Sequence, residues 1–346
     1  MPTLNWKVGV ARQPQGWFRK NYEEYFLQGI FAFGNALFFD NPLKCQASRK
    51  EGFEPFLNLG VFAMSVNGEQ LAQNSNYDWA DNNQVLRQIP LFIVAVPFLT
   101  GGCKHTLSKG IFSFRNSADT TLSFSGIGAS FTSSVSITPL FSVFAKANIG
   151  TAWNYGTWVD LIGIYNPAES EYDPLTSFSE FFYGMAFGAR AIAPLPKHNI
   201  IQLSFNTDYI ASSGAEDGEP WVCGIERDCV NGWRYEASAM LAHTFEGSKL
   251  KMVGLSSSIS GRYSGDDFDQ VYQPYNPAFK TYSLSAMSQF TLTEKQSLLL
   301  MLNASRKRKF ERDADEYEAE ETLMQKYVGA KWGFDGIVIM WNINLL

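Results

Sequence analysis

Residues 281–309, with the sequence TYSLSAMSQFTLTEKQSLLLMLNASRKRK, contain two alternating runs joined by a polar turn. In the first run, Tyr282, Leu284 and Phe290 lie on one face with further apolar residues, while serine, glutamine and threonine occupy the other face. A period of two residues is typical of a β-strand and not of a helix. Because residues 293–296 supply a short polar connection, the stretch predicts a β-hairpin with one apolar and one small, polar face.

The same alternation recurs in other parts of the chain. Residues 198–210 and 233–245 each alternate over about 12 residues, whereas strands of soluble proteins usually have about 5 to 6. A strand that crosses a bilayer at a tilt needs about 9 to 11 residues, with lipid on one side and a polar interior on the other. A soluble β-sandwich would also alternate, but repeat number and run length favour an all-β fold, a transmembrane antiparallel β-barrel.

We expect one barrel domain over residues 1–346, with about 14 strands and a range of about 12 to 16. Residues 107–119 have the weakest strand pattern, and the strand count depends on them. Short turns are predicted on one rim, at residues 194–199, 246–249 and 293–296. Long polar loops are predicted on the other rim, at residues 165–180, 211–232, 263–279 and 310–321. Short turns on one rim and long loops on the other are typical of outer-membrane barrels.

Composition limits the alternatives. The longest apolar run, residues 89–99, is too short for a membrane-spanning helix and contains Pro90 and Pro97. The formal net charge of -6 argues against nucleic acid as a partner, because a phosphate-binding protein needs a basic face. The first ten residues, MPTLNWKVGV, lack the apolar core of a secretory signal, so we expect a chain without its signal peptide.

Residues 13–26, QPQGWFRKNYEEYF, interrupt the alternation near the start of the chain. We expect a loop there, with an inward plug as the alternative. If the segment is a plug, its aromatic side chains would suit the path of a hydrophobic ligand. These residues are Trp17, Phe18, Tyr22, Tyr25 and Phe26.

Four cysteines fit an oxidising compartment. Cys223 and Cys229 lie in one polar loop and could close a short ring, and Cys45 and Cys103 lie in two polar connections. We therefore predict two disulfides, Cys223 with Cys229 and Cys45 with Cys103. Four cysteines allow three connectivities, and free thiols are the alternative.

The residues needed for catalysis are not arranged in a recognisable way. The chain has three histidines and no GxSxG element, so a histidine-based hydrolase has no support. The cysteines lack CxxC spacing. Asp266, Asp267 and Asp269 could hold Ca²⁺, but they lack EF-hand spacing and a solvated acidic loop is favoured. We expect no enzyme activity, no cofactor and no metal site.

Several charged residues share the inward phase of their predicted strands. Charges inside a barrel are stable only if they meet water or one another. Inward serines leave space, which favours a hydrated lumen of mixed charge over a closed network of salt bridges. The inward charged residues are Arg190, Asp208, Arg234, Glu236, Arg262 and Lys331, and the outward aromatics expected near the membrane interfaces are Trp6, Trp233, Tyr235, Trp332 and Trp341.

Residues 327–334, YVGAKWGF, resemble the terminal-strand signature of bacterial outer-membrane β-barrel proteins, with a glycine, aromatics two apart and a final phenylalanine. In that class the signature ends the chain, but here residues 335–346 alternate again as an extra or closing strand that could pair with residues 4–12. The resemblance implies the outer membrane of a Gram-negative cell. It also implies membrane lipid, lipopolysaccharide and the barrel-assembly machinery as partners.

Two functional classes follow from this resemblance and from the polar interior. The first is a channel or transporter that passes small solutes, with a plugged transporter of hydrophobic ligands as a variant. The second is a non-conducting barrel that acts as a scaffold or belongs to a secretion or surface assembly. The class includes both open pores and plugged transporters, so the resemblance leaves the choice open.

Overall fold

A computed structural model describes residues 52–67, 90–123, 126–137, 140–154, 162–223, 226–293, 296–312 and 319–343. The predicted strands at 4–11 and 28–39, the segment 13–26 and Cys45 lie outside these residues. Among the residues described, no helix is long and apolar enough to span a membrane.

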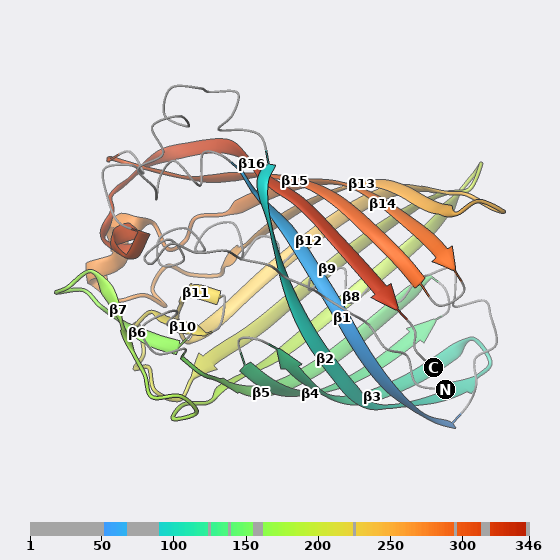
Figure 1. The fold of residues 1–346 in the computed structure, drawn as a ribbon, viewed down its shortest axis with the longest axis horizontal. Helices are drawn as coiled ribbons and strands as arrows, with labels where there is room; N and C mark the ends of the chain where they lie inside the picture. The colour runs from blue at the N-terminus through green and yellow to red at the C-terminus, as the bar shows by residue number, and fades with distance from the viewer. Residues whose placement is uncertain are drawn as a thin grey trace.

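Antiparallel strands form a closed ring (Figure 1). β1 contacts β2 along its whole length and contacts β16 from Gly60–Asn342 to Met64–Val338. The described residues contribute twelve strands to this ring, so the predicted number of about 14 is not confirmed. The barrel strands are β1 (Gly52–Asn67), β2 (Pro90–Lys109), β3 (Phe112–Ser123), β4 (Gly126–Ile137), β5 (Phe141–Ala152), β8 (Phe182–Leu195), β9 (Asn199–Ser212), β12 (Gly232–Thr244), β13 (Leu250–Arg262), β14 (Thr281–Thr293), β15 (Gln296–Phe310) and β16 (Tyr327–Ile343).

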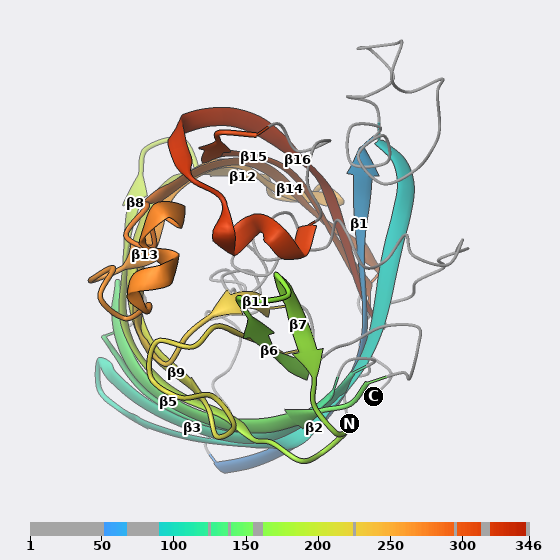
Figure 2. The ribbon, with the colours of Figure 1, turned by 90° about the vertical axis from the view of Figure 1, so that its left-hand side faces the viewer.

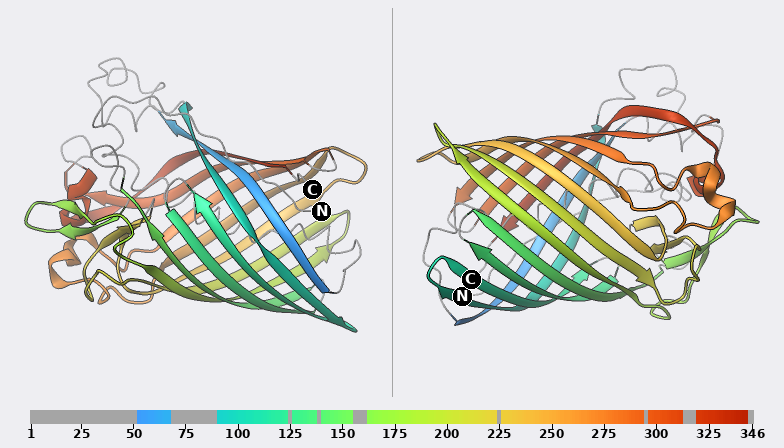
Figure 3. Two further views of the ribbon diagram at one scale, coloured as in Figure 1. Left: turned by 60° about the horizontal axis from the view of Figure 1, so that its bottom comes forward. Right: turned by 180° about the vertical axis from the view of Figure 1, so that it is seen from behind.

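The two faces of the barrel wall follow the alternation of the sequence. Leu203, Phe205, Leu241 and Leu284 point outward and are 45–53% exposed, whereas Gln202, between two of the strand's outward positions, is 5% exposed. Successive side chains of a strand point to opposite faces, so one phase along each strand faces the interior and the other faces the surroundings. Figure 3 shows these strands wrapping around the barrel from two sides.

β16 corrects one prediction about the end of the chain. Residues 327–334 and 337–343 are one strand, not two, and this strand pairs with β1 and β15. Asn303 of β15 lies opposite Gly336 while Ala304 lies opposite Phe334, so Asp335 is an extra residue in a β-bulge. Gly336 has a φ of 115°, which favours glycine. The bulge shifts the phase by one residue, so Trp332 before the bulge and Trp341 after it both lie on the outer face.

The weakly patterned segment 107–119 contains strand on both sides of a turn at Gly110, since β2 ends at Lys109 and β3 begins at Phe112. Cys103 lies within β2, opposite Ala118 of β3, and not in a polar connection as predicted. The two glycines of residues 100–106, TGGCKHT, led to the prediction of a polar connection. These residues instead continue the pairing of β2 with both β1 and β3.

The two ends of the barrel differ in their connections. β8 and β9, β12 and β13, and β14 and β15 are joined by short turns at one end. At the other end the long connections form structure of their own, which lies across the mouth of the ring (Figure 2). We call this structure the cap. It contains the sheet β6 (Ile162–Asn166), β7 (Glu171–Pro174), β10 (Trp221–Cys223) and β11 (Glu226–Cys229), and the short 3-10 helices η2 (Gln270–Tyr275) and η3 (Ala319–Met324).

The cap has two hydrophobic clusters that join it to the barrel rim. In the first, Leu323 of η3 and Tyr272 of η2 are buried with Phe310, at the end of β15. In the second, Trp221 of β10 packs with Phe182, at the start of β8, at 5.2 Å between ring centroids. Because both clusters include barrel residues, the cap is packed onto the rim of the barrel.

Candidate functional site: the barrel interior and its cap

A row of serines crosses the interior wall of the barrel. Each member lies directly opposite the next on the neighbouring strand, from β2 to β15, so all share the inward face. Ser204 and Ser238 are 2.6 Å apart between hydroxyl oxygens. In strand order the row is Ser108, Ser113, Ser136, Ser142, Arg190, Ser204, Ser238, Ser258, Ser283 and Ser305. Small hydroxyl side chains leave room on this face and supply both donors and acceptors.

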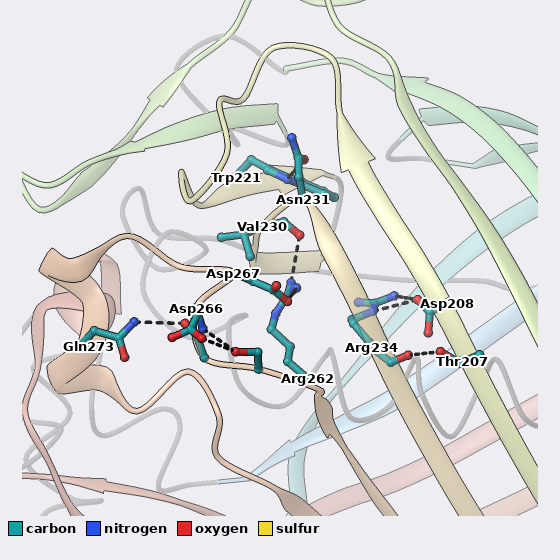
Figure 4. Close-up of polar contacts among 12 residues, drawn as sticks. Thr207, Asp208, Trp221, Val230, Asn231, Arg234, Arg262, Asp266, Asp267 and Gln273 are labelled. Atoms are coloured by element: carbon teal, nitrogen blue, oxygen red, sulfur yellow. Dashed lines mark hydrogen bonds and ion pairs between the residues drawn. The ribbon is translucent and has the colours of Figure 1, made fainter.

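Towards the cap, a second band of the interior is charged. Arg234 of β12 lies opposite Asp208 of β9, and its Nε and Nη2 atoms are 2.8 and 2.7 Å from Asp208 Oδ2 (Figure 4). Both side chains are 15% exposed. These two predicted residues therefore meet as an ion pair that holds adjacent strands together.

Arg262, at the end of β13, links the barrel to the cap. Its Nη2 donates a hydrogen bond of 3.0 Å to the carbonyl of Val230, and its Nη1 lies 3.3 Å from Asp267 Oδ2 (Figure 4). The guanidinium also lies over the ring of Phe268 at 5.3 Å. A side chain that is only 7% exposed and held by three groups is a positioning residue for the mouth of the barrel.

The other three predicted interior residues lie on β8, β12 and β16. Arg190 lies in the serine row, Glu236 is buried on β12 opposite Ser260, and Lys331 is exposed on β16 opposite Lys307. All six residues share the inward phase, and Asp208, Arg234 and Arg262 lie opposite one another on the adjacent strands β9, β12 and β13. The interior charge is spread over several strands.

A buried ion pair was missed by the sequence analysis. Lys307 Nζ lies 2.7 Å from Asp335 Oδ1, and the two side chains are 1% and 4% exposed. Asp335 is the extra residue of the bulge, which directs its carboxylate inward next to Lys307 of β15. The alternation of the sequence places Lys307 on the inward face of its strand. The bulge that supplies its partner Asp335 could be located only from the pairing of β15 with β16.

Methionines line a third part of the interior, on the side of the short turns. Met240, Met252, Met287, Met301 and Met340 are each 4–6% exposed. Met301 lies opposite Met287 and also opposite Val338 of β16. The prediction of a polar interior is therefore incomplete, because buried, flexible methionines share the inward face below the serine row with polar residues. These polar residues are Gln202, Ser256, Ser285 and Asn303.

A hydrogen-bond chain ties the cap together. Tyr172 and Tyr275 donate to the two carboxylate oxygens of Asp228, at 2.8 and 3.0 Å, and the backbone N–H of Asp228 donates to the Tyr172 hydroxyl at 2.9 Å. Arg308 of β15 donates to the Tyr275 hydroxyl at 3.1 Å and lies over its ring. Burial, followed by the nearby Asp228 carboxylate, raises the pKa of Tyr172 well above its usual value, so this hydroxyl remains a donor.

The predicted disulfide between Cys223 and Cys229 is not formed in this structure. The two residues lie on the paired strands β10 and β11, but Cys223 is opposite Glu226 and Cys229 is opposite Trp221. The sequence separation suggested easy ring closure, whereas hairpin register keeps the two residues out of direct opposition. Cys103 forms no disulfide with a described residue, and Cys45 lies outside the described part of the chain.

The acidic loop that could have bound Ca²⁺ makes local contacts instead. Asp266 accepts a hydrogen bond from Ser264, and Asp267 pairs with Arg262. Among the residues described, no group of three or more histidine, cysteine or acidic side chains has a geometry that could hold a metal ion.

The chain matches no protein-family model. It also matches none of the curated proteins. Among solved structures, it resembles the crystal structure of an outer membrane channel from Pseudomonas putida F1, with 11% sequence identity and a TM-score of 0.42. The likeness covers 86% of this chain and 96% of the channel. A likeness this weak assigns no function.

Proposed function

We propose that the protein is an outer-membrane channel or transporter that passes small polar solutes. The observation that carries the proposal is the two-faced wall, with large apolar side chains exposed outside and a continuous row of serines inside. An exposed apolar exterior of this kind needs lipid, since a contiguous apolar surface is unfavourable in water. A face of hydroxyl and charged groups needs water, since unsolvated polar groups are costly.

The cap favours a gated pore over a permanently open one. It lies across the long-connection mouth and is fixed to the rim by Phe182, Phe310 and Arg262. A solute would therefore have to pass through or around a packed structure, and small solutes are favoured over large ones. The same observation supports the alternative of a non-conducting scaffold.

The test is a planar-bilayer conductance measurement on the purified full chain and on a variant with a weakened cap, Arg262→Gln. We expect a measurable current from the wild type and a larger one from Arg262→Gln, because the variant loses its ion pair with Asp267. Current only in the variant would mean that the cap closes the channel at rest. No current from either protein, with correct folding shown by circular dichroism, would overturn the channel function and support the scaffold.

A further inference from the structure

The outer face of the barrel wall carries charges of one sign. Within the twelve barrel strands that the structure describes, every carboxylate has the inward phase. These carboxylates belong to Glu54, Asp119, Asp208, Glu236 and Asp335. The outward phase carries lysine and arginine instead, including Lys109, Arg306 and Arg308. An outer face with cations and without carboxylates in its strands favours an anionic partner.

Two of these cations lie on β15 near the cap. Arg306 lies directly between Tyr282 of β14 and Trp332 of β16, whose side chains are 41% and 55% exposed. Arg308 follows two residues later with the same phase, and Lys280, just before β14, is exposed. We call Lys280, Arg306 and Arg308 the outer cationic patch, since it lies at the cap end of the outer face.

Arg306 is oriented by aromatic rings. Its guanidinium lies over the rings of Phe279 and Tyr282, at 5.2 and 5.7 Å from the ring centroids. It forms no hydrogen bond or ion pair with another residue that the structure describes. A stacked guanidinium uses its face, so the five N–H donors in its plane remain available to an acceptor.

The other two members of the outer cationic patch differ in how they are held. Arg308 donates to the carbonyl of Asn276 at 3.2 and 3.3 Å and to the Tyr275 hydroxyl at 3.1 Å, so it fixes the cap to β15. Lys280 lies beside Gly261 of the wall, with its Cγ 3.7 Å from the position that a Cβ of Gly261 would take. Lys280 and Arg306 are therefore the members that can reach a ligand.

Carboxylates of the adjoining cap connections bind cations outside this patch. Asp267 pairs with Arg262 at the mouth, and Glu311, which follows β15, pairs with Lys326 at 3.3 Å. Within the described ranges of the chain, no ion pair joins the outer cationic patch to a carboxylate. The cap is acidic, but its described carboxylates do not neutralise the patch by direct contact.

The neighbours of Arg306 place it at the level of lipid headgroups. Tyrosine and tryptophan are enriched where a barrel wall passes from lipid to water, because one end of each side chain is apolar and the other polar. Towards the short turns, the same outer face exposes Leu284 and Leu302, by 51% and 49%. These side chains suit acyl chains. A lipid-facing arginine is costly at the bilayer centre and not near the interface, where lipid phosphates lie.

We propose that the outer cationic patch binds a phosphate group of lipopolysaccharide, with Arg306 as the main donor and Lys280 as a second cation. The proposal rests on the outer-membrane location proposed above and not on conduction. Long connections of outer-membrane barrels face the cell exterior, so the cap end lies at the leaflet that contains lipopolysaccharide. Arginine matches phosphate because its planar fork can donate two parallel hydrogen bonds to two phosphate oxygens.

The experiment measures the binding of lipid A, the phosphorylated lipid anchor of lipopolysaccharide, to the purified full chain in detergent by native mass spectrometry. The variants are Arg306→Gln, Arg306→Lys and Lys280→Gln. The control is Lys109→Gln, which removes an exposed, outward cation at the opposite rim of the barrel. Arg308 is left in place because its replacement would also loosen the cap.

We expect the wild type to bind lipid A and not its dephosphorylated form. The Kd of lipid A should rise about tenfold in Arg306→Gln, the loss expected for a hydrogen bond to a charged group. Arg306→Lys and Lys280→Gln should show smaller increases, since the first keeps the charge without the planar fork and the second keeps Arg306. Lys109→Gln should bind as the wild type does.

Several results would overturn the proposal. Equal affinity for lipid A and its dephosphorylated form would exclude phosphate recognition, and equal affinity for phosphatidylglycerol would exclude lipopolysaccharide as the specific partner. An unchanged Kd in Arg306→Gln with the wild-type circular dichroism spectrum, or an equal loss in Lys109→Gln, would overturn the assignment of Arg306. If Arg306→Gln does not fold, an unchanged Kd in both Arg306→Lys and Lys280→Gln would overturn it.

Bilayer conductance of the same preparations separates this inference from the channel function. A chain that conducts but does not bind lipid A would overturn the lipid site and leave the channel function intact. A chain that binds lipid A through Arg306 but does not conduct would support the lipid site and overturn the channel function.

Discussion

In the barrel, the side chains that point inward include serines, charged residues and methionines, whereas the cap encloses aromatic and aliphatic side chains such as Tyr165, Val222 and Leu323. The barrel exposes large apolar side chains such as Leu203 and Leu241 on its outer face, whereas the cap buries its own. A closed ring satisfies its backbone hydrogen bonds without a core, so its interior residues are available for other roles. The cap consists of short strands and single helical turns, which form few backbone hydrogen bonds. Its stability therefore depends on the burial of apolar side chains.

The two regions also differ in charge. Four segments between barrel strands contribute to the cap, residues 153–181, 213–231, 263–280 and 311–326, and together they contain 20 acidic and 4 basic residues. The chain as a whole has 34 acidic residues, so most of its negative charge lies in these connections and not in the barrel wall. The negative net charge of the chain is therefore no guide to the charge of the interior.

The largest expected effect is on the barrel, at the buried pair of Lys307 and Asp335. Lys307→Met should lower the free energy of unfolding by about 3–5 kcal/mol, because it leaves a buried carboxylate without its cation. Urea unfolding in detergent, followed by tryptophan fluorescence, measures the change. The double variant Lys307→Met/Asp335→Leu should recover most of the loss. Lys331→Met, which removes the exposed lysine opposite Lys307, is the control. An equal loss of stability in this variant would show that burial of the ion pair does not cause the destabilisation.

A smaller effect is expected in the cap, where burial and not ion pairing dominates. Leu323→Ala, at a position 1% exposed, should destabilise the cap by about 2–5 kcal/mol and leave the barrel folded. Limited proteolysis should then cut the cap while the barrel keeps its β circular dichroism signal. Val271→Ala, at an exposed position of η2, is the matched control and should have no effect. If cap and barrel lose structure together in Leu323→Ala, the two regions are not energetically distinct.

The smallest effect is a pH dependence confined to the cap. Burial, followed by the charges of Asp269 and Glu219, raises the pKa of Tyr272 from 10.0 to about 12. The unfolded chain releases this proton at lower pH than the folded chain, so the stabilisation is complete below pH 10 and is lost as the pH rises towards about 12. Proteolysis of the cap across this range should accelerate in the wild type. Tyr272→Phe should show a weaker rise, and an identical rise in both would assign the effect to another group.

The alternation of the sequence was enough to predict much of the barrel. In the alternating run 198–210, the phase of the sequence predicts that Leu203 and Gln202 lie on opposite faces, and the structure confirms it, with 53% and 5% exposure. The short turns after β8, β12 and β14 were also predicted, because polar turn residues interrupt the alternation there. These features depend on residues close in the chain, which is the information that a single sequence contains.

The sequence could not predict features that depend on register between distant segments. Long polar loops were expected where β6, β7, β10, β11, η2 and η3 form a cap, because Tyr172, Asp228 and Tyr275 meet only after three separate connections fold together. The prediction of a disulfide between Cys223 and Cys229 was wrong for the same reason. In the register of β10 and β11, Cys223 lies opposite Glu226 and Cys229 lies opposite Trp221.

The sequence by itself determined which side chains of each strand share a face, because the two-residue period is a local property of the backbone. Only the tertiary structure decided which residues meet across strands. The bulge at Asp335 could be recognised once β15 and β16 were paired, and the serine row became continuous only when ten strands were placed in register. A shift of one residue in any pair would exchange the faces, so register and not composition places Arg190 among serines.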